Sequence, residues 1–466
     1  LSDESWWKLR SVFDDFKLRA SVGSAGGRPP FADQYQTLTV GAGGSITAQT
    51  LGNVNLKPEY TLETEYGLDA QIFGKYGLTF TYARDITTHQ ILNVPPSVSS
   101  GFSSQFKNAG IVEGKTYETS LNIPIFTNKT TVWSGRLNWD ANRSYIRAMD
   151  IPTFTSTSNN LLSYFRVGER LGNMYGRKRI TSCAELDPAD GFDKRCGPGK
   201  EWQVNSDGYV VWVGAGNSLT DGVTKNLWQT TLPGCIVKGV PVTTITGAVA
   251  CRAAGGIVNA PYGLPLTSWG MLTVLRDSTG TARTDNLLGN TQPLWRLTFS
   301  QNFQFKKLNV YALLDHSHGN KVYNQQNNWS LGDFLTNAED QNGKTVETAK
   351  PIGYYWRAPS PDNGAGVGGF YDVLGSNEYN IENATYTKLR EVSIGYQIGR
   401  ISHIAGDWTV SAIGRNLMTI SKFSGWDPEV GDGGGFLGSA ALSAVQSAGG
   451  AYPQVRTFTF TLSSKF

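Results

Sequence analysis

The chain closes with the stretch Arg456-Thr457-Phe458-Thr459-Phe460-Thr461-Leu462-Ser463-Ser464-Lys465-Phe466, in which apolar and polar side chains alternate. Successive side chains of a strand point to opposite faces, so one face of this segment carries Phe458, Phe460, Leu462 and Phe466. The other face is rich in threonine. An apolar face suits lipid and a threonine-rich face suits a polar lumen, which together are typical of a strand in an outer-membrane barrel. We expect the four apolar residues to form the barrel-assembly signal, with Phe466 as the true C-terminus.

The same period of two residues recurs along the chain, and it predicts about ten strands, or about twelve if residues 145–290 hide a further pair. From Trp295 onward, for example, Trp295, Leu297 and Phe299 fall on one face. A helix would need apolar residues three and four positions apart, and these segments do not supply them. The predicted strands are residues 15–24, 59–73, 76–90, 106–124, 130–144, 291–304, 308–318, 385–398, 407–418 and 453–466.

The connections between these strands alternate between short and long. The short ones are Phe73–Tyr76, Phe126–Lys129, Phe305–Lys307 and Gly399–Gly406. The long ones, residues 25–58, 91–105, 145–290, 319–384 and 419–452, are mostly rich in Gly, Ser, Asn and Pro. A soluble β-sandwich with one wet face has no reason to sort its loops in this way, whereas short turns at one rim and long loops at the other are typical of an outer-membrane barrel. We therefore predict an all-β, transmembrane antiparallel β-barrel whose C-terminus lies on the periplasmic side.

Composition agrees with that fold class. The chain has 466 residues, of which 39% are hydrophobic and only 17% are charged. No apolar run approaches the ~18 residues that a membrane helix needs, whereas a barrel strand needs only about 9–11 alternating residues. The net charge is +3 and the Lys and Arg residues are scattered, so nothing indicates a nucleic-acid partner.

All four cysteines lie between Cys183 and Cys251. Their spacing has no CxxC pair and no nearby His, which argues against a zinc site. Two loop disulfides, most simply Cys183 with Cys196 and Cys235 with Cys251, fit an oxidising periplasm or cell surface. The alternative is four buried or loop thiols.

Several short motifs, taken together and in order, resemble the SusC/RagA family of TonB-linked outer-membrane transporters. Two of them depart from the family pattern, at Gly114-Lys115-Thr116 and at Arg170, where proline is usual. The motifs are Phe16–Gly23, Asn53–Glu59 with Glu65–Asp69, Asn108–Gly110 with Glu118, Val167–Gly172, Tyr386–Tyr396, Gly414–Leu417, Gly425–Val430 and Tyr452–Phe458.

This resemblance implies a barrel of about 22 strands with a plugged lumen. The whole of residues 1–466 would then be the C-terminal part of the barrel, with 145–290 as a long extracellular loop region. We expect the plug domain, and the N-terminal half of the barrel, to come from a part of the receptor outside this chain. We also expect TonB–ExbB–ExbD to act through that plug. Leu1 is neither an initiator Met nor part of a signal peptide, which predicts a processed, truncated or partial polypeptide.

No enzymatic arrangement stands out, and we expect no catalytic residue, metal or cofactor. His316 and His318 lie two apart on a strand end, where a surface metal site is a minor alternative to ordinary polar residues leaving the membrane. The pairs Glu63/Glu65 and Asp427/Glu429 have the spacing of one strand face, and we interpret them as lumen or loop-anchor carboxylates rather than as a glycosidase pair.

What remains is binding by the long loops. The loop region 145–290 holds four tryptophans, which could contact a ligand or partner or could pack the loop's own small core. They are Trp202, Trp212, Trp228 and Trp269. By resemblance, a SusD-like surface lipoprotein covers these loops and shares the ligand cavity.

Three functions compete. The first is TonB-dependent import of a bulky nutrient, a glycan or a peptide, across the bacterial outer membrane. The second is a passive pore or structural surface component without energised transport. The third is a secreted β-rich binding protein, which release from cells without detergent would favour. The sequence favours the first and does not identify the substrate.

Overall fold

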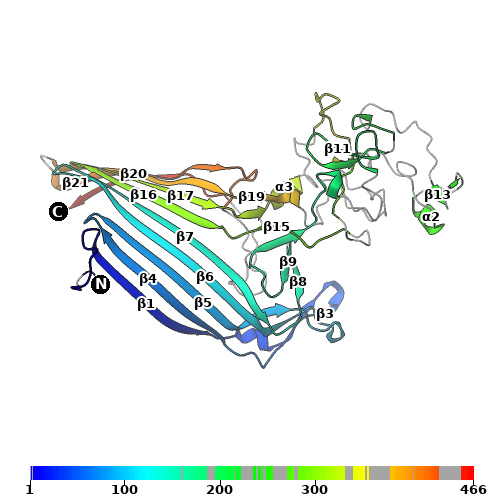
Figure 1. The fold of residues 1–466 in the computed structure, drawn as a ribbon, viewed down its shortest axis with the longest axis horizontal. Helices are drawn as coiled ribbons and strands as arrows, with labels where there is room; N and C mark the ends of the chain where they lie inside the picture. Colours follow the sequence, from blue (N-terminus) through cyan, green and yellow to red (C-terminus); the bar gives the residue numbers. More distant parts are fainter. Residues whose placement is uncertain are drawn as a thin grey trace.

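A computed structural model describes residues 2, 4–158, 161–185, 195–214, 216–221, 235–237, 240–242, 244, 248–255, 270–275, 277, 282–330, 340–351, 354–355, 378–401, 404–429 and 453–465. Long strands lie side by side in one curved sheet, and the long connections gather at one end of it (Figure 1). We call this end the long-loop end and the opposite end the short-turn end.

Ten long strands form the wall of the sheet, and each is antiparallel to its neighbours in chain order. β1 and β22 are the two edges of this path. The strands are β1 (Phe13–Gly27), β4 (Glu59–Ile72), β5 (Tyr76–Val94), β6 (Ser104–Thr127), β7 (Thr131–Met149), β16 (Trp295–Phe305), β17 (Leu308–His318), β20 (Tyr386–Ile401), β21 (Ile404–Ser421) and β22 (Thr457–Lys465). All ten predicted wall strands are confirmed.

The predicted sorting of connections is also confirmed, since every short connection lies at the same end of the wall. Phe73 and Gly74 turn the chain between β4 and β5 with φ angles of 52° and 63°. Lys306 does the same between β16 and β17 with a φ of 51°. The Asn128 side chain accepts hydrogen bonds from the backbone N–H groups of Thr130 and Thr131 and so closes the turn between β6 and β7. Such local hydrogen bonds are why Asn suits tight turns.

The long connections fold into small units of their own. A four-stranded sheet in the order β15-β10-β9-β8 and several two-stranded sheets lie there. In the first sheet the strands are β8 (Phe154–Ser158), β9 (Leu161–Phe165), β10 (Asn173–Gly176) and β15 (Asn286–Asn290). The two-stranded sheets are β11 (Trp202–Val204) with β12 (Val210–Trp212), β13 (Cys235–Val237) with β14 (Val240–Val242), and β18 (Lys321–Tyr323) with β19 (Ile381–Asn383). The hairpin of β2 (Thr37–Val40) and β3 (Ile46–Leu51) instead joins the wall sheet, through a short parallel pairing of β3 with β6.

Helices are short among the described residues, namely α2 (Ala248–Ala253), α3 (Gln325–Trp329) and the 3-10 turns η1 (Phe31–Gln34), η2 (Ala42–Gly44), η3 (Val98–Ser100), η4 (Cys183–Glu185) and η12 (Glu378–Asn380). None of the described helices combines the length and apolar character needed to cross a membrane.

One alternative is wrong for the described residues. Residues 145–290 do not add a pair of strands to the wall, because β7 pairs directly with β16 from Asp140 to Thr131. The strands within that region belong instead to the separate small sheets. β7 itself continues to Met149, beyond the end predicted for this strand at residue 144.

Candidate functional site

The wall presents one continuous polar face. Cross-strand register places Glu118 of β6 opposite Asp140 of β7, and Asp140 opposite Arg296 of β16. Side chains on this face bond to one another from strand to strand. Ser120 donates to Asn138 at 2.8 Å, Asn138 donates to Thr298 at 3.1 Å, Arg136 donates to Asn122 at 2.7 Å and Asn142 donates to Thr116 at 3.0 Å. A polar face of this kind is how barrel strands line a lumen.

Arg19 on the polar face is paired with two carboxylates. Arg19 of β1 donates to Asp69 of β4 at 2.7 Å and to Glu65 of β4 at 3.3 Å. Glu63 lies in the same row and is opposite Asp85 of β5. The interpretation of Glu63 and Glu65 as carboxylates of the polar face is therefore confirmed by the register.

The opposite face is apolar and open. Phe458, Phe460 and Leu462 of β22 are 64%, 80% and 63% exposed. Large apolar side chains also stand exposed on other wall strands, including Leu18, Val22, Tyr66, Tyr117, Trp133, Ile394, Tyr396 and Val410. Exposing an apolar face of this extent to water would be unfavourable, whereas its contact with the acyl chains of lipid is favourable.

A buried ionic cluster ties the β21–β22 connection to β20. Lys388 is buried, and its Nζ donates to Asp427 at 2.7 Å and to Glu429 at 2.8 Å. Arg390 contacts Glu429 and Asp315 of β17, each at 2.5 Å. We call these five residues the rim cluster. Asp427 and Glu429 are therefore loop anchors, as predicted, and they explain why the Gly425–Val430 motif carries two acids.

The rim cluster also sets the charge of Glu429. Burial by itself would raise the pKa of Glu429, but hydrogen bonds from Arg390 and Lys388 outweigh burial and lower the pKa to about 2. Glu429 is therefore ionised at neutral pH. The cluster has three carboxylates and two cations, so it holds the loop without offering a spare cation to a ligand.

A second buried acid organises the Val167–Gly172 motif. Glu169 is buried and accepts hydrogen bonds from Arg166 at 2.8 Å, from Tyr175 at 2.5 Å and from Asn173. Its backbone carbonyl accepts from the Ile146 N–H of β7 at 2.9 Å. The hydrogen bonds of this motif thus hold the loop against β7. They are made although Arg170 departs from the family pattern.

Trp202 and Trp212 pack the core of the loop region. They are 1% and 0% exposed, and they lie in one cluster with Ile180, Val210 and Leu272. In this structure they have no ring face to offer a ligand, so their role is to hold the loop together. Trp228 and Trp269 lie outside the described residues, and their predicted contact with a ligand or partner stays a prediction.

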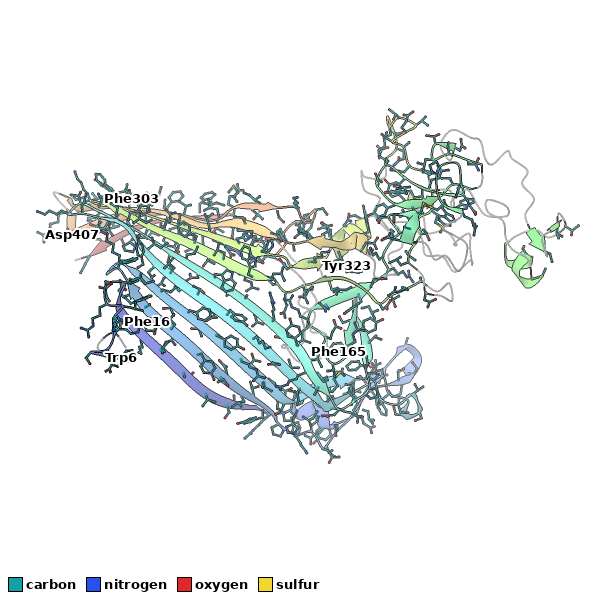
Figure 2. The ribbon with its side chains drawn as sticks, in the orientation of Figure 1. Trp6, Phe16, Phe165, Phe303, Tyr323 and Asp407 are labelled. Atoms are coloured by element: carbon teal, nitrogen blue, oxygen red, sulfur yellow. A yellow bond between two sulfur atoms is a disulfide. The ribbon has the colours of Figure 1, made fainter. Side chains whose placement is uncertain are left out.

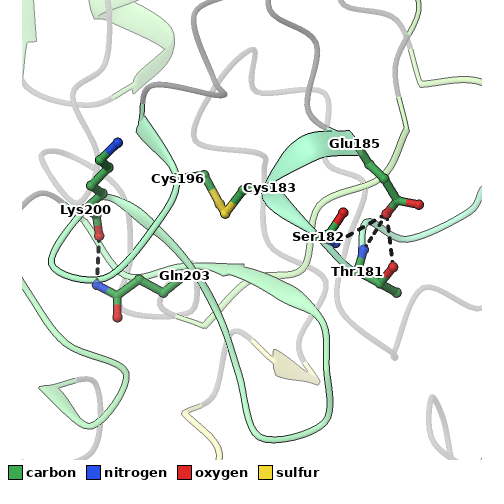
Figure 3. Close-up of a disulfide and its surroundings, with 7 residues drawn as sticks. All are labelled: Thr181, Ser182, Cys183, Glu185, Cys196, Lys200 and Gln203. Atoms are coloured by element: carbon green, nitrogen blue, oxygen red, sulfur yellow. Dashed lines mark hydrogen bonds between the residues drawn. A yellow bond between two sulfur atoms is a disulfide. The ribbon is translucent and has the colours of Figure 1, made fainter.

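The first predicted disulfide, Cys183–Cys196, is confirmed and borders that core (Figure 3). Beside it, Glu185 accepts a hydrogen bond from the Thr181 N–H at 2.8 Å, and Gln203 donates to the Lys200 carbonyl at 2.8 Å (Figure 3). Cys251 is also disulfide-bonded. The side chain of Cys235 lies outside the described residues, so the second pairing stays a prediction.

A pocket of about 380 Å³ lies beside this core. Val211 and Val213 line one side, and Val346 and Pro351 of the β17–β20 connection line another. Lys350 supplies polarity, and it is held by Ser206 at 2.7 Å and Asp207 at 3.1 Å. The volume is at the lower end of the range for small-molecule sites, so this pocket suits one side chain or sugar ring rather than a bulky solute.

The two neighbouring histidines form part of an aromatic stack. The Trp295 ring lies 5.0 Å from the His316 ring and 4.8 Å from the His318 ring. His316 Nδ1 is bonded to the Thr387 hydroxyl at 2.8 Å. These contacts account for both residues as strand-end packing. Phe466 and His403 lie outside the described residues, so the assembly role of Phe466 stays a prediction.

The architecture has counterparts among known proteins. The family model described as "TonB dependent receptor-like, beta-barrel" matches residues 5–233. Over these residues the chain is similar to the barrels of TonB-dependent receptors, and the curated relatives extend this similarity to the rest of the chain. These receptors are transporters rather than enzymes, and their barrels lie in the bacterial outer membrane.

Curated relatives of this receptor barrel include TonB-dependent receptors P3 and P26 of Formosa agariphila, which are 22% and 24% identical to it over its whole length. The chain spans 41% of the length of each. The RagAB peptide transporter has the same fold, with a TM-score of 0.59 and 16% identity over 98% of this chain and 42% of that one. The open-open state of the RagAB importer gives a TM-score of 0.57. The fold predicted from the SusC/RagA resemblance is thereby confirmed as part of a larger barrel.

Proposed function

We propose that the receptor barrel takes part in TonB-dependent import of a bulky nutrient, a peptide or a glycan, across the outer membrane. The observation that carries this proposal is the continuous polar face of the wall, which ends in a folded loop unit at one end only. A polar wall of this length suits the passage of a hydrated solute. The short-turn end, with the C-terminus, would face the periplasm.

The choice between peptide and glycan has one line of support. A solved structure with the same fold is a peptide transporter, which favours a peptide. The polar face of hydroxyl, amide and carboxylate groups would serve either solute. Residues 145–290, proposed as the extracellular loop region, would then meet the nutrient first.

We further propose that a SusD-like surface lipoprotein covers the long-loop end. Exposed apolar side chains on and beside the β2–β3 hairpin support such a partner. Phe31 is 77%, Val40 72% and Ile46 68% exposed. Patches of this kind on a rim that faces water are typical of interaction sites. Co-purification of the full-length receptor with a surface lipoprotein from the same cells would support this, and a receptor purified without any such lipoprotein would contradict it.

Uptake measurements separate energised import from a passive pore. Cells expressing the full-length receptor should accumulate fluorescent peptides or oligosaccharides only when TonB and ExbB–ExbD are active. Uptake that persists after TonB is inactivated would favour a passive pore. No uptake of either solute class in TonB-competent cells would contradict the proposal.

A further inference from the structure

Three cations stand in one row on the apolar face of the wall. Cross-strand register places Arg84 of β5 opposite Lys115 of β6, and Lys115 opposite Arg143 of β7. Residues that are directly opposite on neighbouring strands share a face, so all three side chains lie on the same side as the exposed apolar residues. We call Arg84, Lys115 and Arg143 the basic row. β5, β6 and β7 run side by side in Figure 1.

The basic row has too few acids to balance it. Glu113 contacts Arg84 at 2.5 Å and Lys115 at 3.8 Å, and one carboxylate therefore serves two cations. Arg143 is exposed and has no ion pair among the described residues. On the polar face the balance is reversed, since Arg19 alone is held by two carboxylates.

The residues next to the basic row mark its depth in the membrane. One step toward the short-turn end, Tyr66, Tyr82 and Tyr117 lie opposite one another across β4, β5 and β6. The rings of Tyr82 and Tyr117 are 5.0 Å apart. Tyrosines at this position on a barrel form the belt at the level of the lipid headgroups. The basic row lies just beyond that belt, on the side of the long loops.

Strand lengths agree with this depth. Arg84 is eight residues from the start of β5 at Tyr76, and Lys115 is twelve from the end of β6 at Thr127. At a rise of about 3.3 Å per residue and a tilt of about 40°, these separations are roughly 20 and 30 Å along the barrel axis. The apolar band of such barrels is about 25 Å tall, so the row lies at its upper boundary.

We propose that the basic row binds the phosphate groups of a phosphorylated glycolipid in the outer leaflet. The partner must be anionic, must present its charge at headgroup depth and must have acyl chains that cover the apolar residues below. Arg and Lys side chains bind phosphate through charge-assisted hydrogen bonds. The orientation rests on the proposed function, because it assigns the long-loop end to the cell surface.

Lipid titration tests the proposal. The full-length receptor would be stripped of lipid in detergent and titrated with lipid A, either with its phosphates or after their removal, and followed by native mass spectrometry. We expect the phosphorylated form to bind more tightly. The double variant Lys115→Gln/Arg143→Gln should bind it about 30-fold more weakly, from the contribution of each cation near a charged lipid surface.

A matched control removes two cations from the polar face. The variant Lys17→Gln/Arg136→Gln should bind lipid A as the unmodified receptor does, and the heat-dependent gel mobility of a folded barrel should be the same in both variants. Equal binding by Lys115→Gln/Arg143→Gln, or equal binding of dephosphorylated lipid A, would overturn the proposal. The titration measures lipid binding and involves no transport. Failure of the lipid proposal can therefore be distinguished from failure of the proposed import function.

Discussion

Lys388 and Arg390 show how two neighbouring cations come to share one carboxylate. The register of β20 against β17 and β21 shifts between Leu389 and Glu391, so Arg390 is the extra residue of a bulge. Bulges re-aim side chains. Here both cations reach Glu429, at 2.8 and 2.5 Å. The sequence predicted the acidic anchors from their spacing, but the bulge that brings the cations to them leaves no mark in a period-two pattern.

Replacing Lys388 should release the β21–β22 connection. Lys388→Met leaves the buried carboxylate of Asp427 without its cation, and breaking a buried ion pair from one side costs about 3–5 kcal/mol. We expect faster protease cleavage at residues 422–429 of the folded receptor. Arg415→Gln is the control, because its ion pair with Glu391 is half exposed and such a pair is worth about 0–1 kcal/mol. Equal protection in both variants would contradict the role of Lys388.

The same cluster gives a pH prediction. The pKa of Glu429 is lowered from 4.5 to about 2, so Glu429 stabilises the anchored loop fully above pH 4.5. This stabilisation falls as the pH drops from about 4.5 through about 2, where Glu429 becomes protonated. Pepsin cleavage at residues 422–429, corrected with an unfolded substrate, should therefore rise as the pH falls from 4 to 2. Glu429→Gln should be cut readily throughout, and a constant rate in the unmodified receptor would refute the prediction.

At the scale of elements, strand identity was predictable and strand ends were not. Alternation identified β5 as residues 76–90, whereas the strand continues to Val94. Its register shifts between Thr87 and Ile91, around His89 with a φ of 55°. One extra residue in a strand reverses which of the following side chains point to each face of the sheet. The apolar–polar alternation of the sequence therefore breaks at this point, although the backbone hydrogen bonds continue. β6 similarly runs past Pro124, where a bulge accommodates the missing N–H.

We expect the small core of the loop region to be stabilised by its disulfide. Cys183 and Cys196 are 13 residues apart, and closing a loop of this size stabilises a fold by about 3 kcal/mol. Cys183→Ser/Cys196→Ser should make residues 178–214 more open to proteolysis and hydrogen exchange. β16 and β17 contribute no residue to this core in the described part of the chain, and they should exchange as before. Unchanged exchange at residues 178–214 would mean that Trp202 and Trp212 hold the core without the disulfide.

At the scale of the whole molecule, the wall and the loop unit differ in what the sequence reveals. Every wall strand shows the same alternation of apolar and polar residues, and wall strands that follow one another along the chain also pair with one another in the sheet. The loop core is assembled from distant segments: Tyr354 packs with Trp212, and Glu378 contacts Arg179 at 3.7 Å. No local pattern predicts such pairings. The tryptophans were therefore open to two interpretations until the fold placed them, and Figure 2 shows how far that unit lies from the short-turn end.

The orientation of the whole wall can be tested on a single strand. Phe460 lies on the apolar face of β22 and is 80% exposed, whereas Thr461 pairs with Ser411 on the polar face. A Lys on the lipid face of a barrel costs about 2–4 kcal/mol near the bilayer midplane, while a Lys in the lumen keeps its water. Phe460→Lys should therefore lower the amount of folded receptor in the outer membrane several-fold, measured by heat-dependent gel mobility, and Thr461→Lys should not. Because both variants add the same charge one residue apart, the opposite result would mean that the polar face is turned toward lipid. That outcome would remove the basis for a hydrated path through the barrel.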